Sequence, residues 1–535
     1  MHMRTVARLI LVLLGGALPL GAQSALVTVP VRPISLEDAI RLADRSSESV
    51  EIARAAVTRA SGQHLIARSQ FLPQLSVQAG YTRTLASQFE GFSFGGPDTS
   101  TFRSLCTPEI PQGATPAQRQ AALDQAATCQ SSGGGPDFSS VGFGAENQWM
   151  LGVQFSQNLF TGGRAAGQRA AASAGRRAAD IEVTAQRAQL ILDVTEAYYN
   201  AVLAQRLVEI ADVSLTMTDD VLRQTTSARQ VGAASEFDLL RARVSRDNQL
   251  PVVLQRRSDR TIAMLRLKQM LEIPLEDSLS LTTSIDEAPA ATIAGVSLEH
   301  ASTTVDTSVE RRATVREAEE YVRAQEGLMR AARAERLPTI ALTSGYQRLF
   351  FPSSAFPALN DYRENWTVGI TAGVSLLSGG RIRGGELIAQ ANLREARARH
   401  TQAREFAALD ARIALSQLQQ AEAMWRASQG TAEQAQRAYG IDQVRYREGI
   451  STQTELTQSQ LLVEQATVNR AVAARDLAVA RMRLALLKDL PLGAPGAPGG
   501  AGASPLNAGS AGAGAPMPQP APPPRASTTS GSIQQ

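Results

Sequence analysis

Residue types that commonly carry chemistry are scarce in this chain of 535 residues. The histidines are His2, His64, His300 and His400, and no histidine and cysteine cluster has the spacing of a metal site. The chain also lacks a Gly-x-x-x-x-Gly-Lys phosphate loop and any motif that frames a nucleophile. We therefore expect no catalytic residue, no cofactor and no bound metal.

An excess of one charge is also missing. The chain carries 53 basic and 50 acidic residues, for a net charge of +3, and its only lysines are Lys268 and Lys488. A nucleic-acid-binding protein normally gathers basic residues into a run or a patch. No such run is present, so we expect no nucleic-acid partner.

Long apolar runs are absent as well. The N-terminus has basic residues Arg4 and Arg8, an apolar core from Leu9 to Leu20, and small residues before position 25, which predicts a signal peptide over 1–24. That core is shorter than the roughly 20 residues of a membrane-spanning helix, and no later stretch reaches this length. An exported chain of this kind is expected to be soluble outside the cytoplasm or a β-barrel.

Cysteine occurs only twice, as Cys106 and Cys129, both within a Gly/Pro/Ser-rich stretch over 91–144. In an oxidising compartment the two can form a disulfide, which we expect because the chain carries an export signal. The alternative is two unpaired cysteines in a loop.

What the chain does contain is a stretch of alternating side chains that occurs twice, over 147–164 and 365–381. In the second copy Trp366, Val368 and Ile370 alternate with Thr367 and Gly369, and the polar face carries no charge. This pattern is typical of a transmembrane barrel strand with lipid on one side and a wet lumen on the other. Each copy ends at a strand-to-helix junction, formed by Gly162, Gly163 and Arg164 in the first and by Gly379, Gly380 and Arg381 in the second.

Other motifs also occur twice, which predicts an internal tandem repeat. The Leu-Pro pairs at 72–73 and 337–338 are 265 residues apart, whereas the Gly-Gly-Arg motifs are 217 apart. The difference of 48 residues locates an insertion in the first repeat, a loop over about 86–146. The expected domains are the signal peptide 1–24, a first repeat 25–272, an inter-repeat segment 273–296, a second repeat 297–490 and a disordered Pro/Gly/Ala-rich tail 491–535.

Each repeat is expected to contain a helix, two strands, a long helix, a turn and a returning helix. The expected strands cover about 72–85, 148–160, 338–350 and 366–378, and the expected helices cover 35–70, 163–231, 235–271, 297–336, 380–448 and 452–488. The proline-free helix over 163–231 would be about 100 Å long. Its row of Leu190, Ala197, Ala204 and Ala211 has heptad spacing, which predicts coiled-coil packing.

The two turns between long helices are centred on Gly232 and Gly449. Asp238 and Glu455 each follow the turn glycine by six residues, and each should lie on the second turn of its helix. Two readings remain open: the acid either complements the helix macrodipole or has a functional role at the turn.

Together, the Leu-Pro strand starts, the Gly-Gly-Arg junctions and the two turns resemble the TolC-like outer membrane efflux protein family over about 35–490. The resemblance implies an α+β membrane protein that assembles as a homotrimer. Its 12-stranded β-barrel, with four strands per chain in outer membrane lipid, would continue into a tunnel of long antiparallel α-helical coiled coils in the periplasm. It also implies two partners, a periplasmic adaptor (membrane fusion) protein that docks at Gly232 and Gly449, and an inner-membrane pump.

The resemblance further implies a gate at the turns. Asp238 matches a latch aspartate of the family, Tyr446 matches its tyrosine partner, and Glu455 matches a ring carboxylate as Glu for Asp. Ser451 stands where the family has a latch arginine, and Gln458 where it has a second ring acid. The latch should therefore be weaker here or built differently.

We thus expect a passive outer-membrane exit duct for efflux or type I secretion. The alternative is a periplasmic or surface coiled-coil structural or adhesin protein, which would explain the heptads and the signal but not the four alternating strands. A secreted enzyme has no motif in its favour.

Overall fold

The computed structural model describes residues 32–86, 107–108, 110–132, 145–285, 292–293, 296–297, 308–352 and 362–492. The expected signal peptide, Cys106, the side chain of Cys129 and all but the first two residues of the expected tail lie outside the described residues. The expected disulfide therefore stays a prediction.

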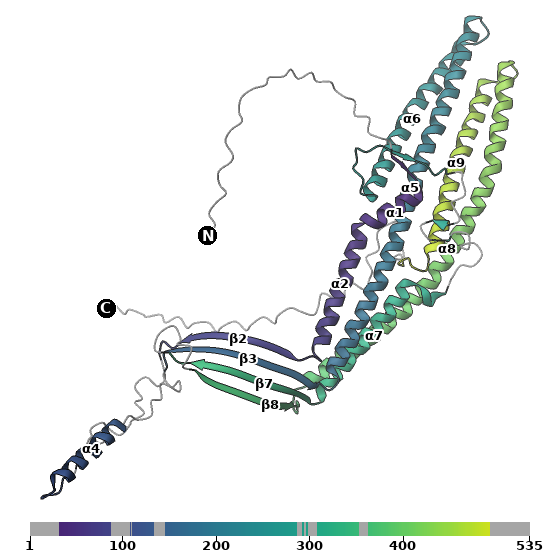
Figure 1. Ribbon diagram of the computed structural model, residues 1–535. Coiled ribbons are helices and arrows are strands. Elements are labelled where there is room, and N and C mark those ends of the chain that lie inside the picture. Colours follow the sequence, from purple (N-terminus) through teal and green to yellow (C-terminus); the bar gives the residue numbers. More distant parts are fainter. Residues whose placement is uncertain are drawn as a thin grey trace, which may run out of the picture. The chain divides into compact units, whose positions relative to one another are not determined.

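A four-stranded antiparallel sheet contains all four expected strands (Figure 1). Its order is β2 (Gln74–Arg83), β3 (Asn147–Phe160), β7 (Thr339–Phe350) and β8 (Arg363–Gly373). The strand expected over 366–378 instead covers Arg363–Gly373. The cause is its partner: Gly373 pairs with Thr339, which follows Pro338 as the first residue of β7, so the ladder has no residue to pair beyond it.

The register separates the side chains into two chemically different faces. Val77, Val153, Tyr346 and Trp366 are consecutive partners across the sheet and therefore share one face. Trp366, Val368 and Ile370 on this face are 74%, 68% and 69% exposed. The opposite face carries small or uncharged polar residues, among them Gln78, Gly152, Thr343, Gly345, Thr367 and Gly369. The sheet thus has an exposed apolar face and a polar face whose only charged residue is Arg363 at the start of β8, with the alternation that the period-two pattern predicts.

Three charged residues lie on the apolar face near the strand ends, namely Arg83 on β2, Arg348 on β7 and Glu364 on β8. Arg348 and Glu364 are paired across β7 and β8. The Tyr346 hydroxyl connects them, because it accepts a hydrogen bond from Arg348 Nε (2.7 Å) and donates one to Glu364 (3.0 Å). The two charges therefore share a polar partner within the sheet.

The insertion expected over 86–146 lies between the paired strands β2 and β3. Its described part is not all loop, because it contains helix α4 (Pro116–Ser132). The Gln118 side chain accepts hydrogen bonds from both the backbone N–H and the hydroxyl of Thr115, at 3.1 Å each. These bonds satisfy polar groups at the start of the helix, which explains why it begins there.

Four long helices make up much of the chain, and their bounds differ from the expected ones by no more than two residues. They are α5 (Arg164–Gln230), α6 (Glu236–Met270), α8 (Arg381–Arg447) and α9 (Gln453–Leu486). Both α5 and α8 contain 67 residues and directly follow a Gly-Gly pair. The helix expected over 35–70 is divided at Ser47 into α1 (Leu36–Ser46) and α2 (Glu48–Ser69).

The helix expected over 297–336 begins later than predicted. Ser297 belongs to β6 (Val296–Ser297), which pairs with β5 (Thr292–Ile293). Within 308–336, the helical elements are η2 (Val309–Arg311), α7 (Ala313–Arg333) and η3 (Ala334–Arg336). The extended backbone of Arg312 separates η2 from α7.

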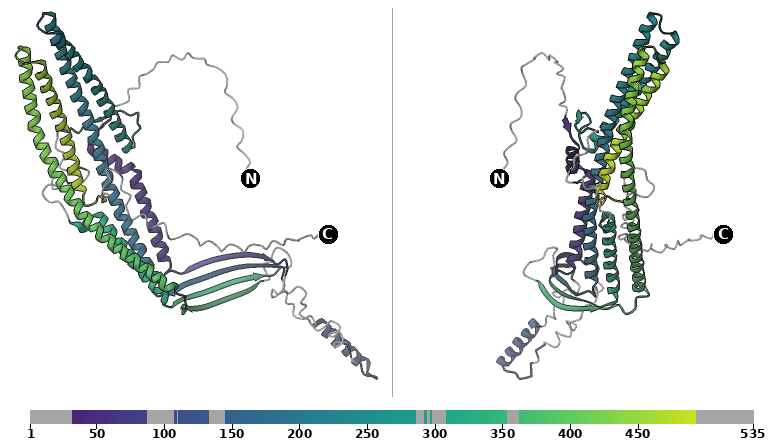
Figure 2. Two further views of the ribbon diagram at one scale, coloured as in Figure 1. Left: turned by 180° about the vertical axis from the view of Figure 1, so that it is seen from behind. Right: turned by 90° about the vertical axis from the view of Figure 1, so that its right-hand side faces the viewer.

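The chain forms two compact units, and α5 and α8 contribute to both. Figure 2 shows the long helices and the sheet in two further views. One unit takes residues from Glu48–Leu190, Thr304–Gln417 and Arg483–Gln535 and contains the sheet. In it, α5 and α7 come into close contact at Gly167 and Gly327. The other unit takes residues from Met1–Ser47, Ile191–Thr303 and Leu418–Met482 and contains α6 and nearly all of α9.

In this second unit a short parallel pair packs on α5. The pair is formed by β1 (Arg32–Ile34) and β4 (Leu279–Leu281). Tyr198 is fully buried; its hydroxyl donates to Ile34 O (3.0 Å) and accepts from the Thr283 N–H (3.2 Å). Tyr198 on α5 therefore holds both β1 and the segment that follows β4 by hydrogen bonds.

Candidate functional site

The strand-to-helix junctions depend on left-handed backbone at paired glycines. Gly162 and Gly163 have φ of 63° and 92°, and Gly379 and Gly380 have φ of 56° and 88°. L-residues with a side chain rarely adopt these angles, so the sequence Gly-Gly lets the chain turn from strand into helix within two residues. After the second pair, Arg381 begins α8 and pairs with Glu335 at 2.8 Å.

The turns between the long helices use the same property of glycine. Gly232 and Gly449 have φ of 79° and 72°. Around Gly449 the N–H groups of Gly449 and Ile450 donate to Tyr446 O (3.1 Å) and Arg445 O (2.8 Å), and the turn at Gly232 has the same pattern. This is the Schellman arrangement that satisfies the last carbonyls of a helix. The two turns are therefore closed by matching hydrogen bonds.

The returning helices begin with a reciprocal cap that involves both predicted acids. Ser235 Oγ accepts from the Asp238 N–H (3.1 Å), and the Asp238 carboxylate accepts from the Ser235 hydroxyl (2.6 Å) and N–H (3.2 Å). Glu455 likewise accepts from the Thr452 N–H (3.0 Å), and Thr452 Oγ1 accepts from the Glu455 N–H (3.3 Å). Both acids thus lie on the first helical turn, not the second as expected.

These caps account for the repeated position of the two acids. The spacing Ser-x-x-Asp and Thr-x-x-Glu is that of a capping box, a signal already present in the sequence. The hydrogen bonds from the hydroxyl and N–H of Ser235 hold the pKa of the Asp238 carboxyl below its ordinary value. Asp238 is therefore a carboxylate at neutral pH in the single chain.

Tyr446 has a different partner from the one expected. Its hydroxyl lies 3.1 Å from Thr225 Oγ1 on α5. Because the Thr225 hydroxyl donates to Val221 O (2.8 Å), Tyr446 is the donor to Thr225. The Asp238 carboxylate accepts its hydrogen bonds from Ser235, and the expected Tyr446–Asp238 hydrogen bond is not formed within this chain.

The predicted residues of the turns nevertheless lie around one groove. Asp238, Tyr446, Gly449 and Ser451 are among the residues that line a hollow of about 730 Å³ between the ends of the two helical hairpins. The two other predicted residues, Gly232 and Glu455, are not among its lining residues. The groove is open, most of its lining residues are polar or charged, and it contacts both turns.

Polar contacts between the hairpins were missed by the sequence analysis. Near the turns, Arg241 Nη1 donates to Thr454 Oγ1 (2.5 Å). Further from the turns, Ser214 Oγ donates to Glu464 (2.7 Å) and Gln460 Nε2 donates to Ser214 O (3.1 Å). Part of the packing between the hairpins could have been predicted from the sequence. The heptad row that includes Ala211 continues to Thr218 and Thr225, which are both buried.

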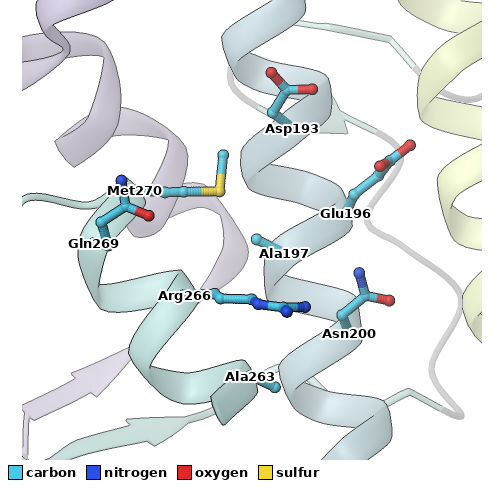
Figure 3. A pocket seen from close by; sticks show the side chains of 8 residues that line it. All are labelled: Asp193, Glu196, Ala197, Asn200, Ala263, Arg266, Gln269 and Met270. Carbon is cyan, nitrogen blue, oxygen red and sulfur yellow. The ribbon is translucent and has the colours of Figure 1, made fainter. Parts of the chain in front are cut away.

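A second hollow of about 470 Å³ lies between α5 and α6 (Figure 3). Asp193, Glu196 and Asn200 come from α5, and Arg266, Gln269 and Met270 come from α6. It holds two carboxylates and one guanidinium but no histidine or cysteine. Across the described residues, no group of three or more His, Cys, Asp or Glu side chains could hold a metal ion.

The chain is similar to known proteins over the segments that contain the strands and the long helices. The family model "Outer membrane efflux protein" matches residues 39–271 and 304–488, which is more than half of the chain. No curated protein matches the sequence significantly. Within the described residues, no helix is long and apolar enough to cross a membrane.

Several solved structures share this fold. The CmeC outer membrane channel of Campylobacter jejuni aligns with a TM-score of 0.65 and 16% identity over 85% of this chain and 86% of its own. The outer membrane protein VceC of Vibrio cholerae gives 0.62 and 16% over 84% and 95%, and the open state of the Neisseria gonorrhoeae MtrE channel gives 0.62 and 17% over 85% and 89%. The chain belongs to the outer membrane efflux protein family, whose members are channels and not enzymes.

Proposed function

We propose that three copies of this chain form an exit duct through the outer membrane, with a 12-stranded barrel in the bilayer and the long helices in the periplasm. The observation that supports this most directly is the open sheet. Among the described residues, β2 and β8 each pair with only one strand, which leaves two rows of unpaired backbone groups. Such edges favour pairing with another chain, and β8 of one copy can pair with β2 of the next.

The size and faces of the sheet support the same assembly. The four strands have 10 to 14 residues, which is enough to cross a bilayer when tilted. Four strands do not close by themselves, whereas 12 strands lie within the range of known barrels. The exposed apolar face would then meet lipid, and the polar face would line a water-filled lumen.

Cysteine crosslinking tests the closure. In a Cys106→Ser/Cys129→Ser background, Thr367→Cys on β8 is combined in turn with Ser76→Cys, Gln78→Cys or Gly80→Cys on β2. These side chains lie on the same polar face, so at least one pair should give a covalent trimer after oxidation. Val368→Cys with the same β2 partners is the matched control, because its side chain lies on the other face. Monomer from every combination would exclude the barrel.

The duct conducts passively, and we propose that an inner-membrane pump supplies energy through a periplasmic adaptor that docks at Gly232 and Gly449. The exposed turns and the groove beside them suit this contact. The insertion over 86–146 would then lie outside the cell, because it joins the strand ends opposite the helices. Cleavage of this insertion by protease added to intact cells tests the orientation, and its protection until the outer membrane is broken would contradict it.

The groove is also where we propose that the resting duct is held closed, by Asp238 and Tyr446, whereas Glu455 lies outside the groove and favours the entry of cations. In this chain the Tyr446 hydroxyl holds α8 to α5 through Thr225. Combining Tyr446→Phe with Asp238→Ala should therefore raise single-channel conductance in a planar bilayer. Glu455→Gln should instead lower the preference for cations without opening the duct. A double variant with wild-type conductance would place the closure elsewhere.

A further inference from the structure

Three glycines near the sheet are packed directly against backbone. Cβ atoms added to Gly167 on α5 and Gly327 on α7 would lie 2.5 and 2.6 Å from each other's carbonyl oxygens. A Cβ added to Gly162, at the junction before α5, would lie 2.8 Å from Ala334 O at the end of α7. All three glycines therefore serve one crossing, in which a helix of the first repeat meets a helix of the second.

The tandem repeat contains a second set of the same glycines. Positions around the long helices α5 and α8 are related by the offset of 217 residues, and positions around α2 and α7 by the offset of 265. Each glycine of the crossing has a glycine at the related position, namely Gly384 for Gly167, Gly62 for Gly327 and Gly379 for Gly162. The second set could thus form a crossing between α8 and α2.

Contacts within each repeat show that the two offsets relate positions in space as well as in sequence. Arg169 on α5 lies over the ring of Phe71, just after α2, at 6.0 Å from the ring centre. The offsets lead from Phe71 to Arg336 and from Arg169 to Glu386, and these two residues form an ion pair between η3 and α8. Helices α2 and α5 therefore meet at the same positions as α7 and α8.

The second set of glycines makes no crossing within one chain. Among the described residues, a Cβ added to Gly62, Gly379 or Gly384 would meet nothing within 4 Å. All of these glycines belong to the unit that contains the sheet. There the helices follow the order α2, α5, α7 and α8, which is also the order of their strands, so α2 and α8 lie at opposite sides (Figure 2). Only the α2 of another copy can therefore meet α8 in this way.

Exposed isoleucines flank the unused glycines. In the crossing of α5 and α7, the flanking positions are Ala171 and Ala331, each 3.1 Å from the Cβ that the opposite glycine would carry. Their related residues are Ile388 on α8 and Ile66 on α2, which are 64% and 69% exposed. Isoleucine in place of alanine buries more apolar surface when two copies associate, which favours the association.

We propose that Gly384 of one copy packs against Gly62 of the next, so that α8 and α2 of neighbouring chains cross as α5 and α7 do within a chain. This contact rests on the proposed trimer and names the helix residues that hold its copies together. It is heterologous, because the two partners present different surfaces, and such contacts can close into a ring. Crossings within chains and between chains would then alternate around the duct.

Two adjacent glycines on α8 allow a matched test. Gly384→Gln inserts a side chain into the proposed crossing, whereas Gly385→Gln adds the same side chain to the neighbouring position, where the first repeat already has Gln168. Neither glycine has another group within 4 Å of its added Cβ in the single chain, so both variants should fold with unchanged circular dichroism. Light scattering in detergent should show trimers for the wild type and Gly385→Gln, and at least about tenfold less trimer for Gly384→Gln, because three overpacked contacts oppose its assembly.

Gly62→Gln tests the other side of the same contact and should lose the trimer like Gly384→Gln. Wild-type amounts of trimer from both variants would overturn the crossing and leave the duct standing. A wild type that stays monomeric in detergent and in lipid would overturn the duct, and the crossing with it.

Thiol crosslinking locates the contact directly. In the Cys106→Ser/Cys129→Ser background, Ile66→Cys is combined with Ile388→Cys and treated with dibromobimane, a short reagent that joins two thiols. A covalent trimer is expected on denaturing gels. The control pair is Ile52→Cys with Ile388→Cys, because Ile52 is 71% exposed but lies about 21 Å from Ile66 along α2. Equal products from the two pairs, whether trimer or monomer, would overturn the crossing.

Discussion

Helices α5 and α7 approach each other closely where they cross, and a single methyl group added there should destabilise the protein. A Cβ added to Gly327 would lie 2.6 Å from Gly167 O and 2.7 Å from the Ala171 backbone nitrogen. The contact is reciprocal, because a Cβ on Gly167 would lie 2.5 Å from Gly327 O. These obstacles are backbone atoms, which cannot rotate away. We therefore predict that Gly327→Ala forces the two helices apart.

The magnitude follows from the distances. Restoring the 2.6 Å approach to the 3.4 Å of an ordinary contact requires the backbones to separate by about 0.8 Å. Overpacking of this kind costs about 1–3 kcal/mol, whereas replacing glycine by alanine within a helix gains up to about 1 kcal/mol. Gly175→Ala on α5 is the matched control, because its Cβ would meet nothing within 4 Å. We expect Gly175→Ala to stabilise the protein and Gly327→Ala to be about 1–3 kcal/mol less stable than that control.

The assay is unfolding by urea or heat, followed by the circular dichroism of the helices in detergent. The double variant Gly167→Ala/Gly327→Ala adds a second criterion: once the first methyl has separated the helices, the second should cost less, so the two effects should not add. Equal stabilisation by Gly327→Ala and Gly175→Ala would refute the reasoning, since it would show that the crossing is not tight.

Three further perturbations test other parts of the molecule. Burial, with a contribution from the Glu182 carboxylate, raises the pKa of Glu317 to about 7. The folded state therefore holds this proton more tightly than the unfolded chain, and stability is lost as pH rises from about 4.5 to 7. The free energy of unfolding of Glu317→Gln, measured by denaturant titration, should equal that of the wild type near pH 4 and exceed it above pH 7 by at most about 3 kcal/mol. A difference that does not change with pH would contradict this. Val368→Arg should lower the folded fraction recovered in lipid vesicles, at a cost of about 2–4 kcal/mol, whereas Thr371→Arg on the other face should fold; equal losses would mean that the faces are assigned wrongly. Tyr198→Phe removes the hydroxyl that bonds Ile34 O and the Thr283 N–H, at a cost of about 1–3 kcal/mol, and should speed hydrogen exchange in β1 and β4; unchanged exchange would mean that other contacts hold them.

Local patterns in the sequence were sufficient to predict the long helices and the alternation of the strands. The strands followed from period-two patterning, and the two Leu-Pro pairs marked where β2 and β7 begin. The end of β8 could not be predicted in the same way, because it depends on which residue of β7 it meets: Thr339 is the last available partner, and Val374 has none. Pairing between distant segments is not encoded in the pattern of either one.

The candidate site likewise contains local contacts that the sequence predicts and long-range contacts that it does not. The caps of Asp238 and Glu455 lie within three residues, so the sequence contained their signal. The partner of Tyr446 is 221 residues away, at Thr225, and only the relative alignment of two helical hairpins brings them together.

The central pair of the sheet also constrains when the sheet can form. Met150 on β3 pairs with Leu349 on β7, so the ladder joins segments about 200 residues apart. At the usual pace of ribosomal synthesis, β7 emerges roughly 10–40 s after β3. Pairs that span long stretches of chain also form slowly, because closing a large loop costs entropy. Until β7 is available, a hairpin of β2 and β3 leaves the edge of β3 unpaired, and such an edge favours aggregation with other chains.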